Sequence, residues 1–143
     1  MAREIYLLTS GGVPTHRNGE LIYRQKEGSK MEISTKTAGD VNVIYLSGRL
    51  DAYAANDVER KLDSLITAGQ VCLVVDLSRL EYISSSGLRV LLAGIKKVKK
   101  EQGDIRLACL QPYVKEVFDI AGFTQLFQMF DKEEDAVNSF KET

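Results

Sequence analysis

The stretch VCLVVDLSRLEYISSSGLRVLL, residues 71–92, decides the fold. It begins with VCLVVDL (71–77), a continuous apolar run of strand length that is typical of a central strand covered on both faces. A short loop is expected next, and the Ser-Ser-Ser-Gly segment at 84–87 then leads into an amphipathic helix. A buried strand, a loop and a helix in this order predict a layered α/β structure.

The helix after the serines has one apolar side and one basic side. Its apolar residues recur at helical spacing and comprise Leu88, Leu91, Leu92, Ile95 and Val98. The other side carries Arg89, Lys96, Lys97, Lys99 and Lys100. Because these cations occupy an outer helix face, we interpret them as a solvated face rather than as a phosphate site.

The alternation of strands and helices continues in both directions along the chain. MEISTKT and VNVIYLSG flank an Ala-Gly-Asp turn and predict an antiparallel pair. The remaining expected elements are helices at 54–68, 112–122 and 132–140 and strands at 104–110 and 125–130. The sequence therefore predicts an α/β fold with a mixed sheet, an antiparallel hairpin at its front and about four helices.

Residues 1–30 differ from the rest, which divides the chain into an extension at 1–30 and a domain at 31–143. Turn-prone pairs such as Gly11-Gly12 and Asn18-Gly19 surround two short apolar stretches, EIYLL and ELIY. These stretches form an extra hairpin, pair with the main sheet or stay flexible, and the residues leave these alternatives open.

Composition excludes several classes of function. With 19 basic and 20 acidic residues, the formal net charge of −1 gives no general attraction to nucleic acid or to a membrane surface. No apolar run approaches the ~20 residues of a membrane-spanning helix. The single histidine, His16, excludes a multi-histidine metal site, and no cofactor is expected. Cys72 and Cys109 lie in apolar runs, which indicates buried free thiols in a reducing cytoplasm.

The serine cluster at 84–86 suits the start of a helix. One serine oxygen accepts a hydrogen bond from an otherwise unpaired N–H group of the first turn. Three serines followed by Gly87 exceed what a cap needs and form a small polar patch at the positive end of the helix dipole. Such a patch suits an anion, or a serine that becomes one by phosphorylation. A plain helix cap is the alternative interpretation.

Three segments together carry a family resemblance. DLSRLEYISSSGLRVLL (76–92), preceded by LSGRLDAYAANDVERKL (46–62), resembles the STAS domain, and specifically the bacterial anti-sigma factor antagonists. CLQPYVKEVFDIAGFTQLFQMFDKEEDAV (109–137) resembles the C-terminal half of the same family. The resemblance covers about residues 31–143 and implies a STAS-like fold.

The resemblance assigns roles to the serine segment. Ser85 falls on the serine that a partner kinase phosphorylates, Ser86 on the small residue after it and Gly87 on the glycine that starts the helix. Ser84 stands where many members have Asp, so a carboxylate is missing beside the phosphate. Chemistry alone leaves the choice among Ser84, Ser85 and Ser86 open, and the resemblance favours Ser85.

Two acidic residues border the serines by resemblance. Asp51 matches the turn after the second strand, and Asp76 matches the residue before the phosphorylation loop. Together with Ser84, Ser86 and Gly87 they are expected to contact the partner. From local chemistry alone, Asp51 is a helix-entry cap and Asp76 a turn former at a strand end.

The implied function is a regulatory switch rather than an enzyme. Unphosphorylated, the protein binds an anti-sigma factor of the serine-kinase type and so frees a sigma factor; phosphorylation breaks the complex and a phosphatase resets it. The kinase binds the ATP and Mg²⁺. The alternative is a STAS scaffold, or an anion- or nucleotide-binding module, that works without phosphorylation. A serine hydrolase lacks a sequence signal, since no base accompanies the serines.

Overall fold

The computed structural model describes residues 4–7, 13–17, 20–24 and 31–141. Its elements are β1 (Glu4–Leu7), β2 (Val13–Arg17), β3 (Glu20–Arg24), β4 (Met31–Ala38), β5 (Val41–Leu50), α1 (Ala52–Thr67), β6 (Cys72–Ile83), α2 (Ser85–Lys100), β7 (Asp104–Ala108), α3 (Pro112–Ile120), the 3₁₀ turn η1 (Phe123–Gln125), β8 (Met129–Phe130) and α4 (Glu133–Lys141). From residue 31 onward, the predicted alternation of strands and helices is confirmed.

A six-stranded mixed sheet forms the centre of the fold, with strand order β1-β4-β5-β6-β7-β8. The strands β1, β4 and β5 pair antiparallel, and β5 to β8 pair parallel. Within 1–30, EIYL therefore pairs with the main sheet, while ELIY belongs to a separate two-stranded sheet of β2 and β3. The predicted mixed sheet with its antiparallel hairpin, β4-β5, is confirmed.

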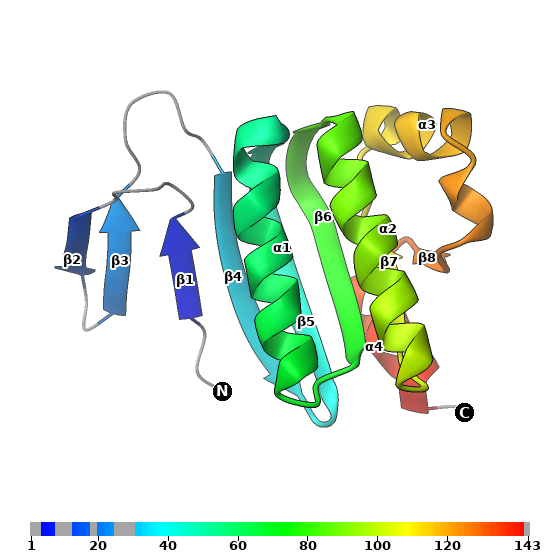
Figure 1. Cartoon of the computed structure of the whole chain (residues 1–143), viewed down its shortest axis with the longest axis horizontal. Coiled ribbons are helices and arrows are strands. Elements are labelled where there is room, and N and C mark those ends of the chain that lie inside the picture. Colours follow the sequence, from blue (N-terminus) through cyan, green and yellow to red (C-terminus); the bar gives the residue numbers. More distant parts are fainter. Residues whose placement is uncertain (1–3, 8–12, 18–19, 25–30, 142–143) are drawn as a thin grey trace.

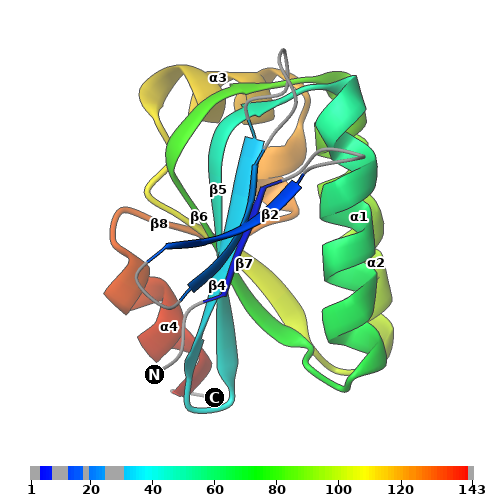
Figure 2. The same ribbon diagram turned by 90° about the vertical axis from the view of Figure 1, so that its left-hand side faces the viewer.

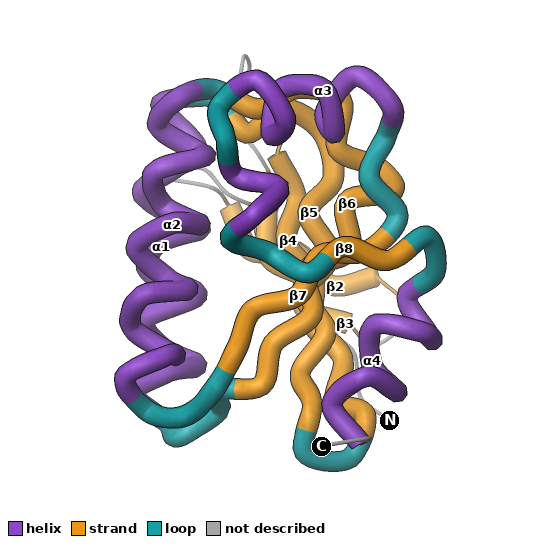
Figure 3. Tube along the Cα trace, turned by 90° about the vertical axis from the view of Figure 1, so that its right-hand side faces the viewer, coloured by secondary structure: helices purple, strands orange, loops and turns teal. Residues whose placement is uncertain are grey.

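The helices lie on both faces of the sheet. In Figure 1, α1 and α2 run side by side along one face, and Figure 2 shows them on the side opposite α4. Figure 3 shows α3 across one end of the sheet, above α4. Parallel strands joined through helices bring the start of α1 and the start of α2 to the same end of the sheet.

The central strand β6 is longer than the sequence predicted, and the expectation of a loop after Leu77 is wrong. The strand continues to Ile83 through two irregularities in its pairing with β5, one after the pair Tyr45/Asp76 and one after the pair Gly48/Leu80. At each point β6 has one residue more than β5. A β-bulge absorbs the extra residue and increases the local twist.

Each bulge also resets which face of the sheet a side chain meets. Leu77, Leu80 and Ile83 are spaced by three residues, yet all three are buried in the core beneath α1 and α2. A regular strand would turn every second residue to that core. The two bulges therefore explain why these buried residues are three apart. Ile83, the last of them, lies directly before the start of α2.

Two hydrophobic cores of unequal size hold the layers together. The larger one lies between the sheet and the pair α1–α2, and α2 contributes Leu91 and Val98 with no exposed surface. The smaller one lies beneath α4 and comprises Val41, Val43, Val74, Ala108, Ala136 and Val137.

The segment before α4 departs from the predicted strand at 125–130. Only Met129–Phe130 pairs with β7, because residues Phe123–Gln125 form a 3₁₀ turn. The ring of Phe127 packs edge-on against Phe118, with 6.1 Å between ring centroids, and both are buried. Burial of Phe127 in the main core thus replaces strand pairing at this position.

The two cysteines are free, but they are half-buried rather than buried as the sequence suggested. Cys72 begins β6, and Cys109 follows β7. Burial, and then the nearby Asp76 carboxylate, raise the pKa of the Cys109 thiol. A raised pKa lowers the fraction of thiolate, which is the reactive form.

Candidate functional site

Helix α2 begins where the sequence placed its cap. Ser84 has extended backbone angles, and its Oγ accepts a hydrogen bond from the Gly87 N–H at 3.1 Å. The Ser84 N–H in turn donates to the Leu50 carbonyl at 2.8 Å, which ties the start of α2 to the end of β5. The prediction that a serine of this cluster caps the helix is confirmed, and the capping residue is Ser84.

The three serines differ in what their side chains can reach. Ser84 is half-buried, and its oxygen is engaged by the cap. Ser86 is half-buried and lines a groove between α1 and α2. Ser85, the first residue of the helix, is exposed. Of the three serines, Ser85 is therefore the most exposed to solvent.

Gly87 is required at this helix start because the backbone packs directly on the core. A Cβ atom added to Gly87 would lie 2.7 Å from Leu50 Cγ and 3.0 Å from Ile83 Cγ1. Real side chains do not approach so closely, so any larger residue must displace Leu50, Ile83 or the first turn of α2. The position of Ser85 thus depends on the two strand ends that meet beneath Gly87.

Asp51 lies next to the serine segment, as expected. It directly follows Leu50, which pairs with Ile83, the residue before Ser84. Its Oδ1 accepts a hydrogen bond from the Ala54 N–H at 2.9 Å, so Asp51 caps α1 as Ser84 caps α2. The two helix caps therefore stand side by side at the ends of neighbouring strands.

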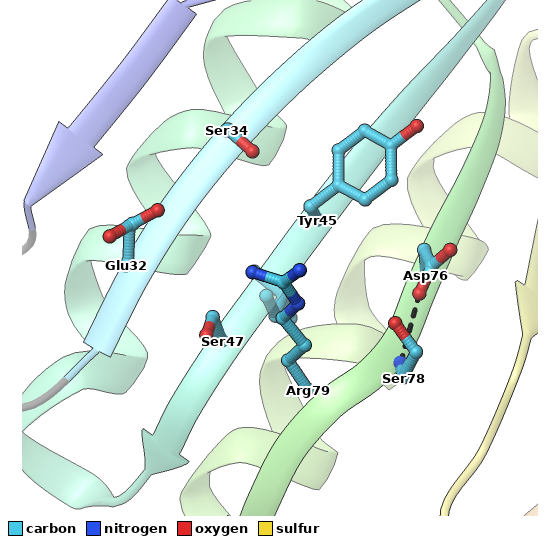
Figure 4. A pocket seen from close by; sticks show the side chains of 8 residues that line it. Glu32, Ser34, Tyr45, Ser47, Asp76, Ser78 and Arg79 are labelled. Atoms are coloured by element: carbon cyan, nitrogen blue, oxygen red, sulfur yellow. Dashed lines mark hydrogen bonds between the residues drawn. The ribbon is translucent and has the colours of Figure 1, made fainter.

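Asp76 does not lie beside the serines, and the expectation that it borders them is wrong. It pairs with Tyr45 in the middle of the sheet, seven residues before Ile83, and its side chain lies on the face opposite α1 and α2. Its Oδ1 accepts from the Ser78 N–H at 2.9 Å, across the first bulge (Figure 4). With 6% of its surface exposed, Asp76 stabilises this bulge.

A polar pocket surrounds Asp76 on that second face. It is lined by Glu32, Ser34, Tyr45, Leu46, Ser47, Asp76, Ser78 and Arg79, most of which Figure 4 shows. The pocket combines both signs of charge, with two carboxylates and one guanidinium. This pocket could not be predicted from the sequence, because its lining comes from three strands whose register was unknown.

Glu133 fastens α4 beside this pocket. Its carboxylate accepts from Lys36 Nζ at 3.1 Å and from the Tyr45 hydroxyl. Burial by itself would raise the pKa of Glu133, but these hydrogen bonds outweigh it and hold that pKa below its usual value. Burial and the bond to Glu133 raise the pKa of Tyr45 to about 12. Glu133 therefore stays ionised and Tyr45 protonated near neutral pH.

Several residues near the serines were not predicted from the sequence to belong to the site. Tyr53, in the first turn of α1, exposes 58% of its surface. Its position outside the apolar spacing of α1 is the signal that could have identified it. The Arg49 guanidinium stacks on the Tyr82 ring at 4.3 Å, close to the point where β6 leads into α2. Only the register of β5 against β6 reveals that pair.

Neither a cluster of metal-ligating side chains nor a membrane-spanning helix occurs among the described residues. Within 31–141 and the three short strands before it, no group of three or more His, Cys, Asp or Glu is placed to hold a metal ion. None of the described helices has the length and apolar composition needed to cross a bilayer. His16 lies in β2, whose side chains are outside the described residues.

Comparison with known proteins identifies the domain. A family model for the STAS domain matches residues 32–136. The Bordetella bronchiseptica protein BtrV, whose name proposes an anti-sigma factor antagonist, is 35% identical over 111 residues, which are 78% of this chain and 96% of BtrV. The anti-sigma-B factor antagonist of Bacillus subtilis is 31% identical over 66% of this chain and 85% of its own.

Solved structures show the same fold. An anti-sigma factor antagonist from Mycobacterium paratuberculosis has a TM-score of 0.71 at 24% identity, covering 77% of this chain and 93% of its own. The anti-sigma factor antagonist SpoIIAA in its unphosphorylated form has a TM-score of 0.64 at 23% identity, covering 78% of this chain and 99% of its own. The phosphorylated form of the Bacillus protein SpoIIAA has a TM-score of 0.63 at 24% identity, with 76% and 98% covered.

Proposed function

Because this chain belongs to the STAS domain family, we propose that it is an anti-sigma factor antagonist whose binding surface is switched by phosphorylation of Ser85. The observation that carries the proposal is the exposed hydroxyl of Ser85 at the start of α2, beside Asp51. The names of the relatives support the regulatory role, and the solved phosphorylated form of SpoIIAA supports phosphorylation as the switch.

Ser85 is the best acceptor of the three serines on structural grounds. Phosphorylation of Ser84 would remove the cap of α2, because its oxygen accepts from the Gly87 N–H. Ser86 is half-buried in the groove between two helices. A phosphate on Ser85 instead points into solvent and leaves the helix and its cap intact.

The switch works through the surface that the partner meets. In the unphosphorylated form, the surface formed by Asp51, Ser84, Ser85 and Ser86 docks on an anti-sigma factor of the serine-kinase type and frees a sigma factor. Gly87, which the sequence also suggested as a contact, is buried beneath this surface. That kinase then transfers the γ-phosphoryl group of ATP to Ser85 Oγ, releasing ADP and the hydroxyl proton. The added charge of roughly −1.5 to −2 and the added bulk break the complex. A phosphatase hydrolyses the phosphate and restores binding.

Asp76 takes a different part from the one that the resemblance implied. Since it lies on the other face of the sheet, we assign it to shaping β6 rather than to contact with this partner. The chain itself supplies an acceptor hydroxyl and a docking surface and catalyses no reaction. Because sigma factors act on RNA polymerase, we place the exchange in the cytoplasm.

The test begins with partner capture from the organism's own lysate. Tagged wild type, Ser85→Ala and Ser85→Asp are compared by mass spectrometry, with Ser64→Asp, at an exposed position of α1 outside this surface, as the matched control. We expect wild type, Ser85→Ala and Ser64→Asp to retain an anti-sigma factor that Ser85→Asp loses. The captured factor, incubated with wild-type protein, ATP and Mg²⁺, should then phosphorylate Ser85 and leave Ser85→Ala unmodified.

Two outcomes oppose the proposal in different ways. If the captured factor places no phosphate on residues 84–86, the phosphorylation switch is wrong. If Ser85→Asp retains the factor as well as Ser85→Ala does, the protein acts as a scaffold that binds without being switched at this position.

A further inference from the structure

Arg89 stands one helical turn after Ser85 on α2. It is exposed, and together with Ser86 it lines the groove between α1 and α2. Among the residues that the structure describes, Arg89 takes part in no ion pair, whereas Lys97 pairs with Asp63 and Lys99 with Asp104. Arg89 is thus a cation beside the serine segment with which no described carboxylate forms an ion pair.

Helix geometry directs the Arg89 side chain toward Ser85. Residues four apart on a helix are neighbours, with Cβ atoms about 5–6 Å apart. Side chains of a helix lean toward its N-terminus, so the long Arg89 side chain extends over the turn that begins with Ser85. An anion placed four residues before a cation is also the more favourable order along a helix.

The surroundings leave this cation available. Neither α1 nor α2 has an acidic residue in its first turn, and the cap of α2 is the uncharged Ser84. Asp51 is the nearby carboxylate, and it is engaged by the Ala54 N–H. Glu59 borders the same groove from α1, yet it forms no ion pair with Arg89.

We propose that Arg89 is the intramolecular partner of phosphoserine at position 85, and that phosphorylation draws its guanidinium out of the α1–α2 groove and onto the phosphate. This inference rests on the proposed function, in which Ser85 is the acceptor. A guanidinium donates two parallel N–H bonds to phosphate oxygens, a geometry that a lysine lacks. One phosphate therefore alters two places: the start of α2, where it is attached, and the groove, from which the Arg89 side chain withdraws.

The experiment installs phosphoserine at position 85 during translation of the full chain, so it needs no kinase. The second ionisation of the phosphate is followed by ³¹P NMR as a function of pH, in the otherwise wild-type protein and in Arg89→Gln. The matched control is Lys100→Gln, which removes the same charge from an exposed position at the far end of α2.

A nearby guanidinium favours the dianion, so Arg89 should lower the pKa of the phosphate. We expect Arg89→Gln to raise that pKa by about 0.3 unit, Lys100→Gln to leave it unchanged within about 0.1 unit, and Arg89→Lys to fall between. About 1 M NaCl should remove most of the difference. Equal titrations for Arg89→Gln and the parent phosphoprotein, or an equal shift in Lys100→Gln, would overturn the inference. Neither result bears on whether a kinase modifies Ser85, which the kinase assay decides separately.

Discussion

The two faces of the sheet are built differently. Between the sheet and α1–α2 lies a large core, and the helices approach so closely that Gly87 and Gly94 have no room for a side chain without displacing neighbours. On the other face, α4 packs Ala136 and Val137 onto four small buried residues of the sheet, and polar contacts hold it at both ends. Glu133 binds Lys36 at its start, and Ser139 accepts from Arg106 at 2.7 Å near its end.

This difference bears on the proposed switch at Ser85. Close-packed protein interiors resist deformation. A side chain whose backbone packs against such an interior therefore keeps its position when its charge changes. Ser85 begins a helix that is anchored by Gly87 against Leu50 and Ile83. A phosphate there changes what a partner meets and need not change the fold. The α4 face, with its smaller core, is the part that we expect to yield first to mutation or acid.

The largest effect is expected at Gly87. Replacing Gly87 by Val forces a side chain onto Leu50 and Ile83, so the free energy of unfolding should fall by about 3 kcal/mol. Urea denaturation measures this, and Ser86→Val, the adjacent position with room in the groove, should lose less than about 1 kcal/mol. A Gly87→Val protein as stable as Ser86→Val would show that the helix start is not tightly packed.

A matched pair of valines compares the two faces directly. Val74 and Val75 are neighbours in β6, both are buried, and they face the small and the large core respectively. We expect Val75→Ala to lower the free energy of unfolding by about 2 kcal/mol and Val74→Ala by about 1 kcal/mol, because the smaller layer relaxes more readily around a cavity. A reversed order in the same denaturation series would contradict the proposed difference in rigidity.

The hydrogen bond that caps α2 should contribute less to the free energy of unfolding than Gly87 or Val75 does. Ser84→Ala removes the oxygen that accepts from the Gly87 N–H and should lower the free energy of unfolding by about 1 kcal/mol. Ser84→Asp keeps an acceptor at this position and should retain the wild-type stability. Thermal unfolding of both variants, with Ser86→Ala as the control, tests the assignment. Equal losses at 84 and 86 would mean that the cap hydrogen bond contributes nothing.

The smallest effect concerns the contact between Glu133 and Lys36. Since the pKa of folded Glu133 lies below its ordinary value of 4.5, its contribution is fully present above that value and is lost as the pH falls through the folded pKa. Glu133→Gln should cost about 0.5 kcal/mol at pH 7, a small amount because the pair is partly exposed to solvent. Wild type and variant should then converge in stability as the pH falls below 4.5 and through the folded pKa. A difference that grows in acid would contradict this sign.

Much of the fold followed from periodicity. The apolar spacing of residues 88–98 placed α2 on the sheet, and the turn signal at Gly39 separated β4 from β5. The serine cap was predicted because helix starts need acceptors for unpaired N–H groups. These features depend on local chemistry, which a single sequence displays.

Other features depend on register between distant segments. The continuous apolar run before Asp76 conceals which face each side chain meets, so its placement away from the serines could not be foreseen. The bulges convert a polar stretch that resembles a loop into strand, and only the spacing of Leu77, Leu80 and Ile83 hinted at them. The contact between Lys36 and Glu133 joins residues 97 positions apart, which no local pattern reveals.

The most direct test of the switch is the affinity of the captured anti-sigma factor for two forms of this protein. Titration calorimetry compares the unmodified chain with the chain that carries phosphoserine at position 85, and phosphoserine at the exposed Ser64 in α1 controls for added charge. Desolvating a phosphate in the interface should weaken binding about 100-fold or more, while the Ser64 control should bind like the unmodified protein. Equal affinity for the unmodified and Ser85-phosphorylated chains would contradict the account.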